Sequence, residues 1–549
     1  MKNVVLILAL TMIFSACKGQ TKITKSSTGE RRDWSAYPME TGDFDSSWES
    51  LEKYNVPEWY RDAKLGFWSI IGPQAVPLQG DWYARNMYVQ GSRQNRYHLE
   101  HYGHPSEFGY KDLIEMFNPT KLNYDELLKL YKQAGGKYAV ILAVHHDNFD
   151  LWNSKYHEWN SVKKGPKRDL VGEFRDAALK NDMRFGVTTH LARSYSWFQS
   201  NKGADTSGVM KGVPYDGNNP EYEALYHKPF EQPENTNYYQ IRYPINPPEE
   251  WENQWYLRIK DLIDQYEPDF MYFDGSIPFN EGDLVSENEQ SSVGRRIMAH
   301  YYNSNMKCHG GKLEAVLSNK NAANHGTFRD GVAMQSFERG IADDIRKDYW
   351  QTETCIGGWY YNANQKYKSV EHVVHILIDI VSKNGNLLLN IPLHPDGSID
   401  EKERALLEGL GKWMEINGEG LYGTRAWNVY GEGPSTKKKS TKEQDFNPSS
   451  HDVAETYTSE DFRYTCEGEE ILNAFFMKWP EDGKLTLRLL AKNSNNKAKI
   501  DKVELLGSTA KLAFQYSSKG LEIELPTEKP CEHAWTLKVS GKNLRSFSF

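Results

Sequence analysis

The chain has 549 residues, of which 39% are hydrophobic and 26% are charged. This balance is typical of a soluble globular protein rather than of a disordered or membrane-embedded chain, and the length indicates two or three domains. The formal net charge of -9 argues against a nucleic-acid partner, because no basic stripe offsets phosphates. The one tight basic run, Lys437 to Lys439, is interpreted as a solvated linker.

The first residues have the layout of an export signal. Lys2 precedes an apolar run from Val4 to Phe14 that is too short to span a bilayer comfortably. The following "FSAC" resembles the cleavage box of bacterial lipoproteins, in which Cys17 becomes the lipidated first residue. An ordinary signal peptide with an incidental cysteine is the alternative. We expect an exported lipoprotein, periplasmic or associated with the outer membrane, that meets a membrane only through its lipid anchor.

Six apolar, strand-like runs alternate with amphipathic helical stretches between about residues 50 and 420, which predicts a parallel sheet buried on both faces. The runs cover residues 65–72, 137–146, 184–191, 268–275, 312–319 and 386–392. Helical spacing of apolar residues is clearest in 249–266 and 369–383. We therefore predict a (β/α) TIM-like barrel with loop insertions, of which residues 194–248, without any period, form the longest.

Short segments with a period of two follow the barrel region. "KLTLRLLAK" at 484–492 and "LEIELP" at 521–526 are typical of a small antiparallel β-sandwich. Cys466 and Cys531 belong to this part; both a disulfide and two free thiols remain open for them. The predicted division of the chain is a signal peptide, a linker, a catalytic barrel and a β-sandwich, at residues 1–17, 18–50, 51–420 and 421–549.

Polar side chains stand where several predicted strands end. His145 and His146 lie at the end of one run, His190 near the end of the next, and Asp274 near the end of the run after that. In a (β/α) barrel the carboxyl ends of the strands carry the active site. The aromatic content of 13% also makes carbohydrate a reasonable substrate class, because sugar sites use aromatic faces as platforms.

Hydrolysis of a glycoside generally needs two carboxylates, one that attacks or activates water and one that protonates the leaving oxygen. Asp274 is the first candidate. Glu338, in "SFERGIADD", is the second, with Glu314 and Glu353 as competitors that spacing alone does not separate.

Seven motifs together resemble the α-L-fucosidases of glycoside hydrolase family 29. They are "KLGFWSIIGPQAVPLQGDWYARNMY", "HHDNFDLWNSKYHEWNSV", "GPKRDLVGEF", "PDFMYFDG", "FERG", "VSKNGNLLLNIP" and "LYGTRAWNVYGEGP". The resemblance runs from about residue 50 into the C-terminal sandwich. It implies an exo-acting, retaining glycosidase that needs no metal or organic cofactor and acts on an oligosaccharide or polysaccharide.

The resemblance also implies roles for single residues. Asp274 takes the nucleophile's place in the family, and Glu338 is our choice for the acid/base. The paired histidines at 145 and 146 correspond to groups that hydrogen-bond ring hydroxyls in the deepest subsite. The remaining residues expected to bind substrate are Asp81, Trp82, Tyr83, His190, Arg193 and Tyr272.

Two departures from the family pattern bear on the substrate. Ile70 and Ile71 stand where relatives usually have His-Trp, and "HLARSY" replaces "HASHxW", so that Arg193 and Tyr195 take the places of His and Trp. Because arginine pairs well with sulfate, an L-galactoside or a sulfated sugar of an algal polysaccharide becomes an alternative substrate to L-fucose. Compensated drift in an ordinary fucosidase is the other explanation, and a catalytically lapsed, surface sugar-binding protein is the alternative of another class.

Overall fold

The computed structural model describes residues 33–229, 247–275, 277–279, 292–320, 330–437, 446–447, 456–492 and 498–546. The predicted signal peptide with Cys17 lies outside the described residues, as do residues 230–246 of the long insertion and most of the lysine-rich linker. Residues 39–549 form one compact unit, separate from residues 1–38. Within the described ranges, no helix combines the length and the apolar character needed to cross a membrane.

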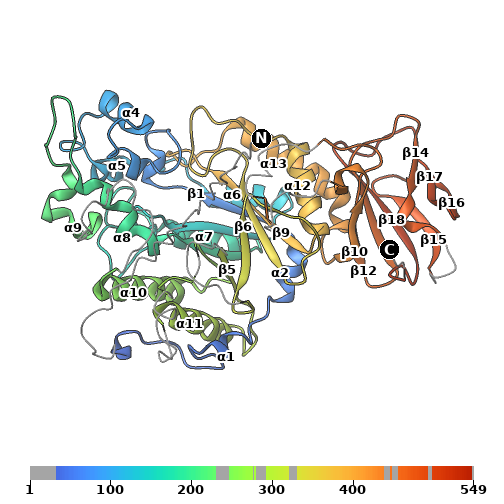
Figure 1. Cartoon of the computed structure of the whole chain (residues 1–549), viewed down its shortest axis with the longest axis horizontal. Coiled ribbons are helices and arrows are strands. Elements are labelled where there is room, and N and C mark those ends of the chain that lie inside the picture. The colour runs from blue at the N-terminus through green and yellow to red at the C-terminus, as the bar shows by residue number, and fades with distance from the viewer. Residues whose placement is uncertain are drawn as a thin grey trace, which may run out of the picture. The chain divides into compact units, whose positions relative to one another are not determined.

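Eight parallel strands close into a barrel, which confirms the predicted TIM-like fold (Figure 1). Each strand pairs with the next, and the last returns to the first with Leu65 opposite Leu387. In order around the barrel the strands are β1 (Leu65–Ile70), β2 (Tyr138–Val144), β3 (Arg184–Thr189), β4 (Phe270–Phe273), β5 (Val316–Lys320), β6 (Met334–Glu338), β8 (Trp350–Cys355) and β9 (Gly385–Pro392).

Six of these strands overlap the predicted apolar runs, of which β5 and β9 each extend one residue beyond the run, whereas β6 and β8 lie in no predicted run. Both missed strands are polar, with the sequences "MQSFE" and "WQTETC". Several of their polar side chains hydrogen-bond to one another and to neighbouring residues. Gln351, for example, accepts a hydrogen bond from Tyr60 at 2.6 Å and donates one to Ser336 at 3.2 Å. A hydrophobicity pattern therefore could not find these two strands.

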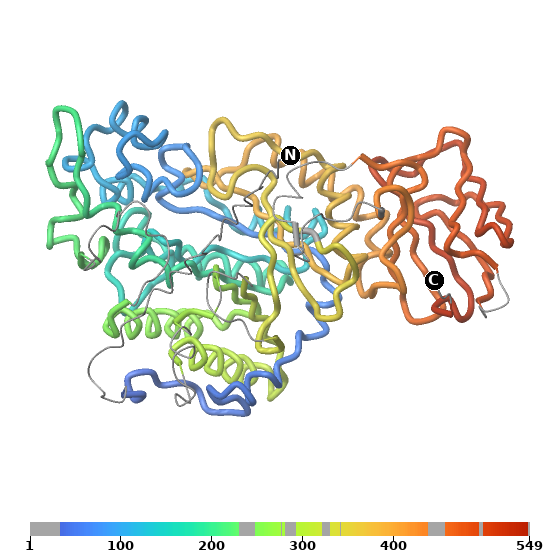
Figure 2. Tube along the Cα trace, in the orientation of Figure 1, coloured from blue at the N-terminus to red at the C-terminus, as the bar shows by residue number. Residues whose placement is uncertain are grey.

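Helices surround the barrel, and the chain can be followed around it by colour in Figure 2. The predicted helical stripes are buried, with Trp255 and Ile259 on one helix and Val374 and Leu377 on another. The principal helices are α6 (Tyr124–Gln133), α7 (Leu170–Lys180), α10 (Glu249–Tyr266), α11 (Val293–Cys308), α12 (Val370–Ser382) and α13 (Glu401–Asn417).

The interior of the barrel is filled by large side chains. Trp68, Tyr138, Phe270 and Tyr272 belong to one buried cluster. Tyr60, from the short helix α2 (Glu58–Ala63), joins this cluster, and its hydroxyl lies 3.3 Å from that of Tyr138. Because the interior is solid, chemistry is confined to the end of the barrel where the strands terminate.

Antiparallel sheets follow the barrel, as predicted. A five-stranded sheet has the order β10-β12-β13-β18-β15, and a three-stranded sheet has the order β14-β17-β16. Both sheets contribute to one core, and Cys466 and Cys531 are free thiols. The strands are β10 (Arg425–Glu432), β12 (Phe462–Glu467), β13 (Ile471–Phe476), β14 (Lys484–Leu487), β15 (Lys499–Leu505), β16 (Ala513–Ser517), β17 (Gly520–Glu524) and β18 (Trp535–Lys542).

A buried ion triad joins α12 to the five-stranded sheet. Asp379 of α12 lies 2.7 Å from the Lys383 ammonium and 2.6 Å from Arg463 Nε on β12. All three side chains are at most 6% exposed. Burial alone would raise the pKa of Asp379, but the two cations hold it well below its ordinary value. The carboxylate is therefore the shared counterion of two buried positive charges.

We predict that Asp379→Ala lowers the free energy of unfolding by about 3–5 kcal/mol, because it leaves two buried cations without a counterion. The matched control is Asp501→Ala, which removes an exposed partner 2.8 Å from Lys499 and should cost about 0–1 kcal/mol. Urea unfolding followed by tryptophan fluorescence measures both variants. Equal losses of unfolding free energy in the two variants would contradict the role of Asp379 as the shared counterion.

Candidate active site

Asp274 lies directly beyond the end of β4. Its backbone N–H donates to the carbonyl of Thr189 at 3.1 Å, which continues the pairing of β3 and β4 by one residue. Gly275 then turns the chain with a φ of +119°, a conformation that residues with a side chain rarely adopt. The backbone thus holds the Asp274 carboxylate, 7% exposed, at the mouth of the barrel.

Four basic side chains surround the Asp274 carboxylate. Lys320 Nζ lies 2.5 Å from Oδ1, whereas His190 Nδ1, His146 Nε2 and Arg193 lie 3.3, 3.4 and 4.0 Å from Oδ2. Burial alone would raise the pKa of Asp274, but attraction by Lys320 and then by its other neighbours holds it well below the ordinary value. Asp274 is ionised at neutral pH, as a nucleophile must be.

Glu338 ends β6 and shares the lysine with Asp274. Lys320 Nζ lies 2.8 Å from Glu338 Oε2, and the indole N–H of Trp359 donates to Oε1 at 3.1 Å. Since both carboxylates touch one nitrogen, Asp274 Oδ1 and Glu338 Oε2 are at most 5.3 Å apart, the sum of 2.5 and 2.8 Å. Attraction by Lys320 lowers the pKa of Glu338.

The two competing acids have different surroundings. Glu314 pairs with Arg184 at 3.1 Å, at the beginning of β3, so it belongs to the opposite end of the barrel. Glu353 is only 1% exposed and accepts hydrogen bonds from Ser336 and Tyr272, the latter at 3.0 Å. Burial raises the pKa of Glu353 to about 7. Of these acids, Glu338 has the most exposed side chain, at 43%.

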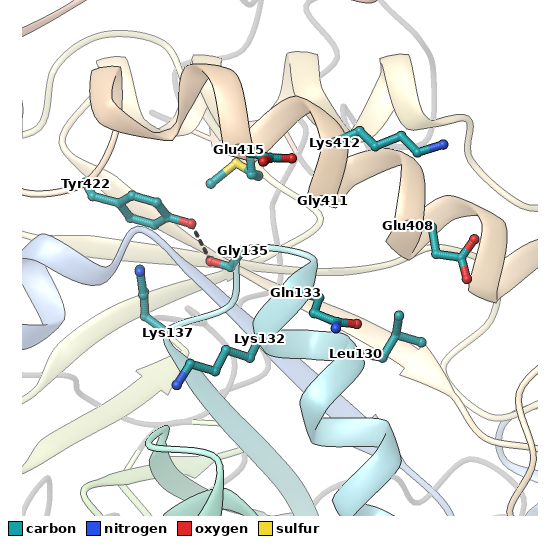
Figure 3. Close-up of a pocket in the computed structure, with 11 residues that line it drawn as sticks. Leu130, Lys132, Gln133, Gly135, Lys137, Glu408, Gly411, Lys412, Glu415 and Tyr422 are labelled. Atoms are coloured by element: carbon teal, nitrogen blue, oxygen red, sulfur yellow. Dashed lines mark hydrogen bonds between the residues drawn. The ribbon is translucent and has the colours of Figure 1, made fainter.

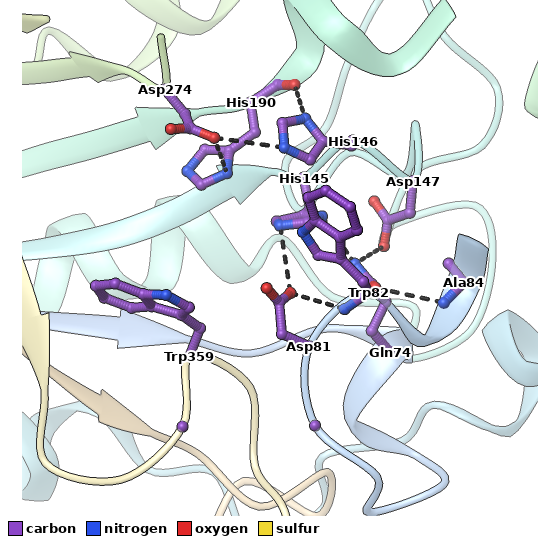
Figure 4. A network of polar contacts seen from close by, with 12 residues as sticks. Gln74, Asp81, Trp82, Ala84, His145, His146, Asp147, His190, Asp274 and Trp359 are labelled. Atoms are coloured by element: carbon purple, nitrogen blue, oxygen red, sulfur yellow. Dashed lines mark hydrogen bonds and ion pairs between the residues drawn. The ribbon is translucent and has the colours of Figure 1, made fainter. Parts of the chain in front are cut away.

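The hydrogen-bond partners of Gln74 determine where His145 carries its proton. The Gln74 amide nitrogen donates to Asp147 at 3.2 Å, and its oxygen accepts from the backbone N–H of Ala84 at 3.4 Å, which fixes the amide orientation (Figure 4). The same nitrogen lies 2.9 Å from His145 Nδ1 and therefore donates to it. Because burial holds the pKa of His145 well below its usual value, the ring is neutral and protonated on Nε2.

His146 has the opposite arrangement. Its Nδ1 lies 2.6 Å from the carbonyl oxygen of His190, which requires a proton on Nδ1. Its Nε2 faces the Asp274 carboxylate at 3.4 Å. Burial lowers the pKa of His146, whereas its hydrogen bond with Asp274 and the charge of that carboxylate act in the opposite direction. Both ring nitrogens of His146 thus have fixed partners, while the protonated Nε2 of His145 is a donor directed toward Asp81.

A buried ion pair anchors the loop that follows these histidines. Arg258 of α10 binds both carboxylate oxygens of Asp150, and it donates to the side-chain oxygen of Asn148 at 2.7 Å. Both partners of the ion pair are completely buried. Asp150 and Asn148 therefore support the loop through Arg258.

Asp81 and Trp82 flank the histidines. Asp81 lies 3.7 Å from His145 Nε2, and burial raises its pKa to about 7. The ring of Trp82 packs edge-on against His146 and Trp197, with centroids 6.4 and 5.7 Å apart. Tyr83 points elsewhere: it is fully buried, and its hydroxyl lies 3.0 Å from His98. The structure thus brings Asp81 and Trp82 to the histidines but not Tyr83.

The positions that depart from the family pattern have distinct environments. Ile70 belongs to the buried cluster inside the barrel, and Ile71 is fully buried. Arg193 is 12% exposed and lies beside Asp274, as noted above. The ring of Tyr195 packs against His227, with centroids 5.4 Å apart. Tyr272 lies beneath the mouth, where its hydroxyl reaches Glu353.

Sequence reasoning missed four residues of this site: Lys320, Trp359, Gln74 and Trp197. Lys320 directly follows the predicted run 312–319 and ends β5; a polar residue at the end of such a run is the signal that identified Asp274 and could have found Lys320. Trp359 follows the unpredicted strand β8, and Gln74 acts through His145, so no local pattern marks either of them.

Among the described residues, His145, His146 and His190 each place a ring nitrogen within 4.8 Å of the other two, a spacing that could hold a metal ion.

A separate hollow of about 540 Å³ lies near the start of β2 (Figure 3). There Tyr422 donates to the carbonyl of Gly135 at 2.6 Å, and the Lys137 ammonium lies 4.2 Å from its ring centroid. This hollow is at the opposite end of β2 from the histidines.

Comparisons with known proteins agree with this geometry. The chain matches the family model for alpha-L-fucosidase over residues 35–419 and that for the alpha-L-fucosidase C-terminal domain over residues 455–540. It is 26% identical over 522 residues to plasma alpha-L-fucosidase of Pongo abelii, which covers 91% of this chain and 93% of that protein.

Solved structures give the same result. A Thermotoga maritima alpha-fucosidase in complex with fucose has a TM-score of 0.65 at 26% identity, covering 90% of this chain and 100% of that chain. A GH29 alpha-L-fucosidase from Bacteroides thetaiotaomicron shares the fold, with a TM-score of 0.60 at 18% identity over 92% of this chain and 99% of that chain. The chain belongs to the alpha-L-fucosidase family, glycoside hydrolase family 29, and is a glycoside hydrolase.

Proposed function

We propose that the protein is an exo-acting, retaining α-L-glycosidase that releases terminal α-L-fucose, or a closely related L-sugar, from oligosaccharides or polysaccharides. The observation that carries the proposal is the carboxylate pair bridged by Lys320. One oxygen of each carboxylate lies within 5.3 Å of the other, a spacing compatible with the separation of about 5–5.5 Å between the carboxyl groups of retaining enzymes.

The reaction then has two steps. Asp274 attacks the anomeric carbon while Glu338 gives its proton to the glycosidic oxygen, so that the sugar becomes bonded to Asp274 and the rest of the substrate leaves. Water next attacks the same carbon, Glu338 takes a proton from it, and Asp274 leaves as a carboxylate. Two inversions restore the original anomeric configuration.

The residues around the carboxylates support binding of a hydroxylated ring. The donor at His145 Nε2 suits a ring hydroxyl group, and Asp81 lies within reach of the same region. A sugar that lacked the matching hydroxyl would leave these buried polar groups unpaired, which is a strong penalty. Trp82 and Trp359 offer aromatic surface for the apolar side of the ring.

Arg193 favours a second candidate substrate. Its guanidinium lies 4.0 Å from Asp274, next to where the sugar would react, and guanidinium groups bind sulfate through paired, charge-assisted hydrogen bonds. An L-galactoside or a sulfated L-sugar is therefore the alternative to plain L-fucose.

A binding protein without catalysis is disfavoured, because it has no use for a charge-stabilised nucleophile beside a second acid. Export as a lipoprotein through Cys17 remains part of the proposal.

We predict that the two acids respond differently to removal. Asp274→Ala should abolish release of product from an aryl α-L-fucoside. Glu338→Gln should slow cleavage of an alkyl glycoside by about 10²–10⁴-fold, but it should slow a dinitrophenyl glycoside less, because that leaving group needs no proton. Glu353→Gln is the comparison, since Glu353 is the rival acid. A leaving-group dependence confined to Glu353→Gln would transfer the acid role to it.

A sugar-binding protein would give another result: wild type would release nothing, and Asp274→Ala would bind oligosaccharide as tightly as wild type. The stereochemical outcome is read separately by proton NMR of the first product formed. Appearance of the inverted anomer would contradict the two-step mechanism.

We predict that Arg193 determines the preference for a sulfated substrate. If the anionic sugar is the substrate, Arg193→Leu should reduce kcat/KM for an aryl α-L-fucoside sulfate by about 10- to 100-fold, the equivalent of a hydrogen bond to a charged group. Aryl α-L-fucoside and α-L-galactoside are assayed beside it, with the exposed Arg488→Leu as control. Full rates on the simple fucoside, unchanged in Arg193→Leu, would reject the modified-sugar alternative.

A further inference from the structure

Lys320 contacts both proposed catalytic carboxylates. It ends β5, which lies between β4, leading to Asp274, and β6, ending at Glu338. Its backbone N–H donates to the carbonyl of Gly275 at 2.8 Å, so the end of the strand is fixed. The side chain is 18% exposed, and its ammonium lies 4.0 Å from Glu353.

Charged and titratable groups from several strands face this lysine and the acid beside it. Those facing Lys320 are Asp274, Glu338, Glu353, Tyr272 and His190, and those facing Glu338 are Lys320, Asp274, Glu353, Arg339, Asp81 and Tyr272. Arg193 and His146 act on the far oxygen of Asp274. Burial opposes the charge on Lys320, but its carboxylate neighbours keep its pKa above the ordinary value. The ammonium is therefore permanent across the working pH range.

We propose that Lys320 is a positioning residue that controls the ionisation of the carboxyl pair, favouring an ionised Asp274 before attack and an ionised Glu338 after it. The inference rests on the proposed function, because it assigns Lys320 a part in that two-step reaction. Two carboxylates this close would otherwise share a proton, since each negative charge makes ionisation of the other harder.

The reaction itself changes the balance around Lys320. In the free enzyme the negative charge of Asp274 raises the pKa of Glu338, which opposes the lowering by Lys320. Once Asp274 is bonded to the sugar, it carries no charge and no longer raises the pKa of Glu338. Lys320 still lowers that pKa. The pKa of Glu338 therefore falls between the steps, and the same residue changes from acid to base.

This arrangement also sets the pH dependence. Lys320 lowers the pKa of Glu338 in the free enzyme, and the first step requires Glu338 to be protonated. The enzyme form that can react has Glu338 protonated and Asp274 ionised. It therefore becomes more abundant as the pH falls toward the pKa of Glu338, as long as Asp274 stays ionised. Removing the positive charge should raise the pKa of both carboxyls and move the whole profile to higher pH.

The experiment measures kcat/KM against pH for wild type and Lys320→Met with an aryl α-L-fucoside. We expect the alkaline limb to move up by about one pH unit or more, the size of effect that an opposite charge within about 4–6 Å produces. Lys320→Gln is a second neutral variant. Lys320→Arg keeps the positive charge and should leave the alkaline limb at the pH found for wild type. Lys499→Met, at an exposed position of the β-sandwich, should change nothing. An alkaline limb that stays in place in both neutral variants would overturn the proposal.

A second measurement does not depend on activity. Carbon-13 NMR of enzyme labelled at glutamate carboxyls, with Glu338→Gln to assign the signal, follows the ionisation of Glu338 directly. Lys320→Met should titrate this carboxyl at higher pH, and an unchanged titration would refute the role of Lys320. If wild type cleaves no glycoside while the titration still moves, the proposed function fails and the electrostatic role stands. Melting temperatures confirm that the variants compared are folded.

Discussion

The mouth of the barrel depends on one partly buried ammonium group. Carboxylates from adjacent strands converge on Lys320, and without a cation between them they would repel one another at the distances observed. The lysine can occupy this position because β5 lies between the strands that carry its partners. Strand order, rather than any local motif, thus assembles the charges, and the surrounding residues are arranged around them.

The histidines add a second layer to this arrangement. Their protonation follows from groups behind them: Gln74 and Asp147 on one side and the carbonyl of His190 on the other. Burial lowers the pKa of both rings, and these partners set the direction of their hydrogen bonds. Charge and hydrogen bonding are therefore supplied by different residues. Lys320 and Arg193 supply positive charge, and the paired imidazoles supply hydrogen bonds of fixed direction.

Much of this could be predicted from the sequence, for physical reasons that differ from residue to residue. Apolar runs predict most barrel strands because their side chains face packed helices or core, and Asp274 was found because it follows such a run. The strands β6 and β8 were missed because Gln335, Ser336 and Gln351 make them polar. Three glutamates could not be separated by spacing, since only the closed barrel shows that Glu314 lies at the wrong end. Lys320 resembled any exposed lysine until its neighbours were known.

The packed interior of the barrel has a consequence for turnover. Tyr60 and the aromatic residues around it fill the interior of the barrel, so a substrate can reach the mouth only from outside. If the protein is the exo-acting glycosidase proposed above, the chain end, the incoming water and the freed monosaccharide would all share that one opening. The monosaccharide would then have to leave before another chain end could bind.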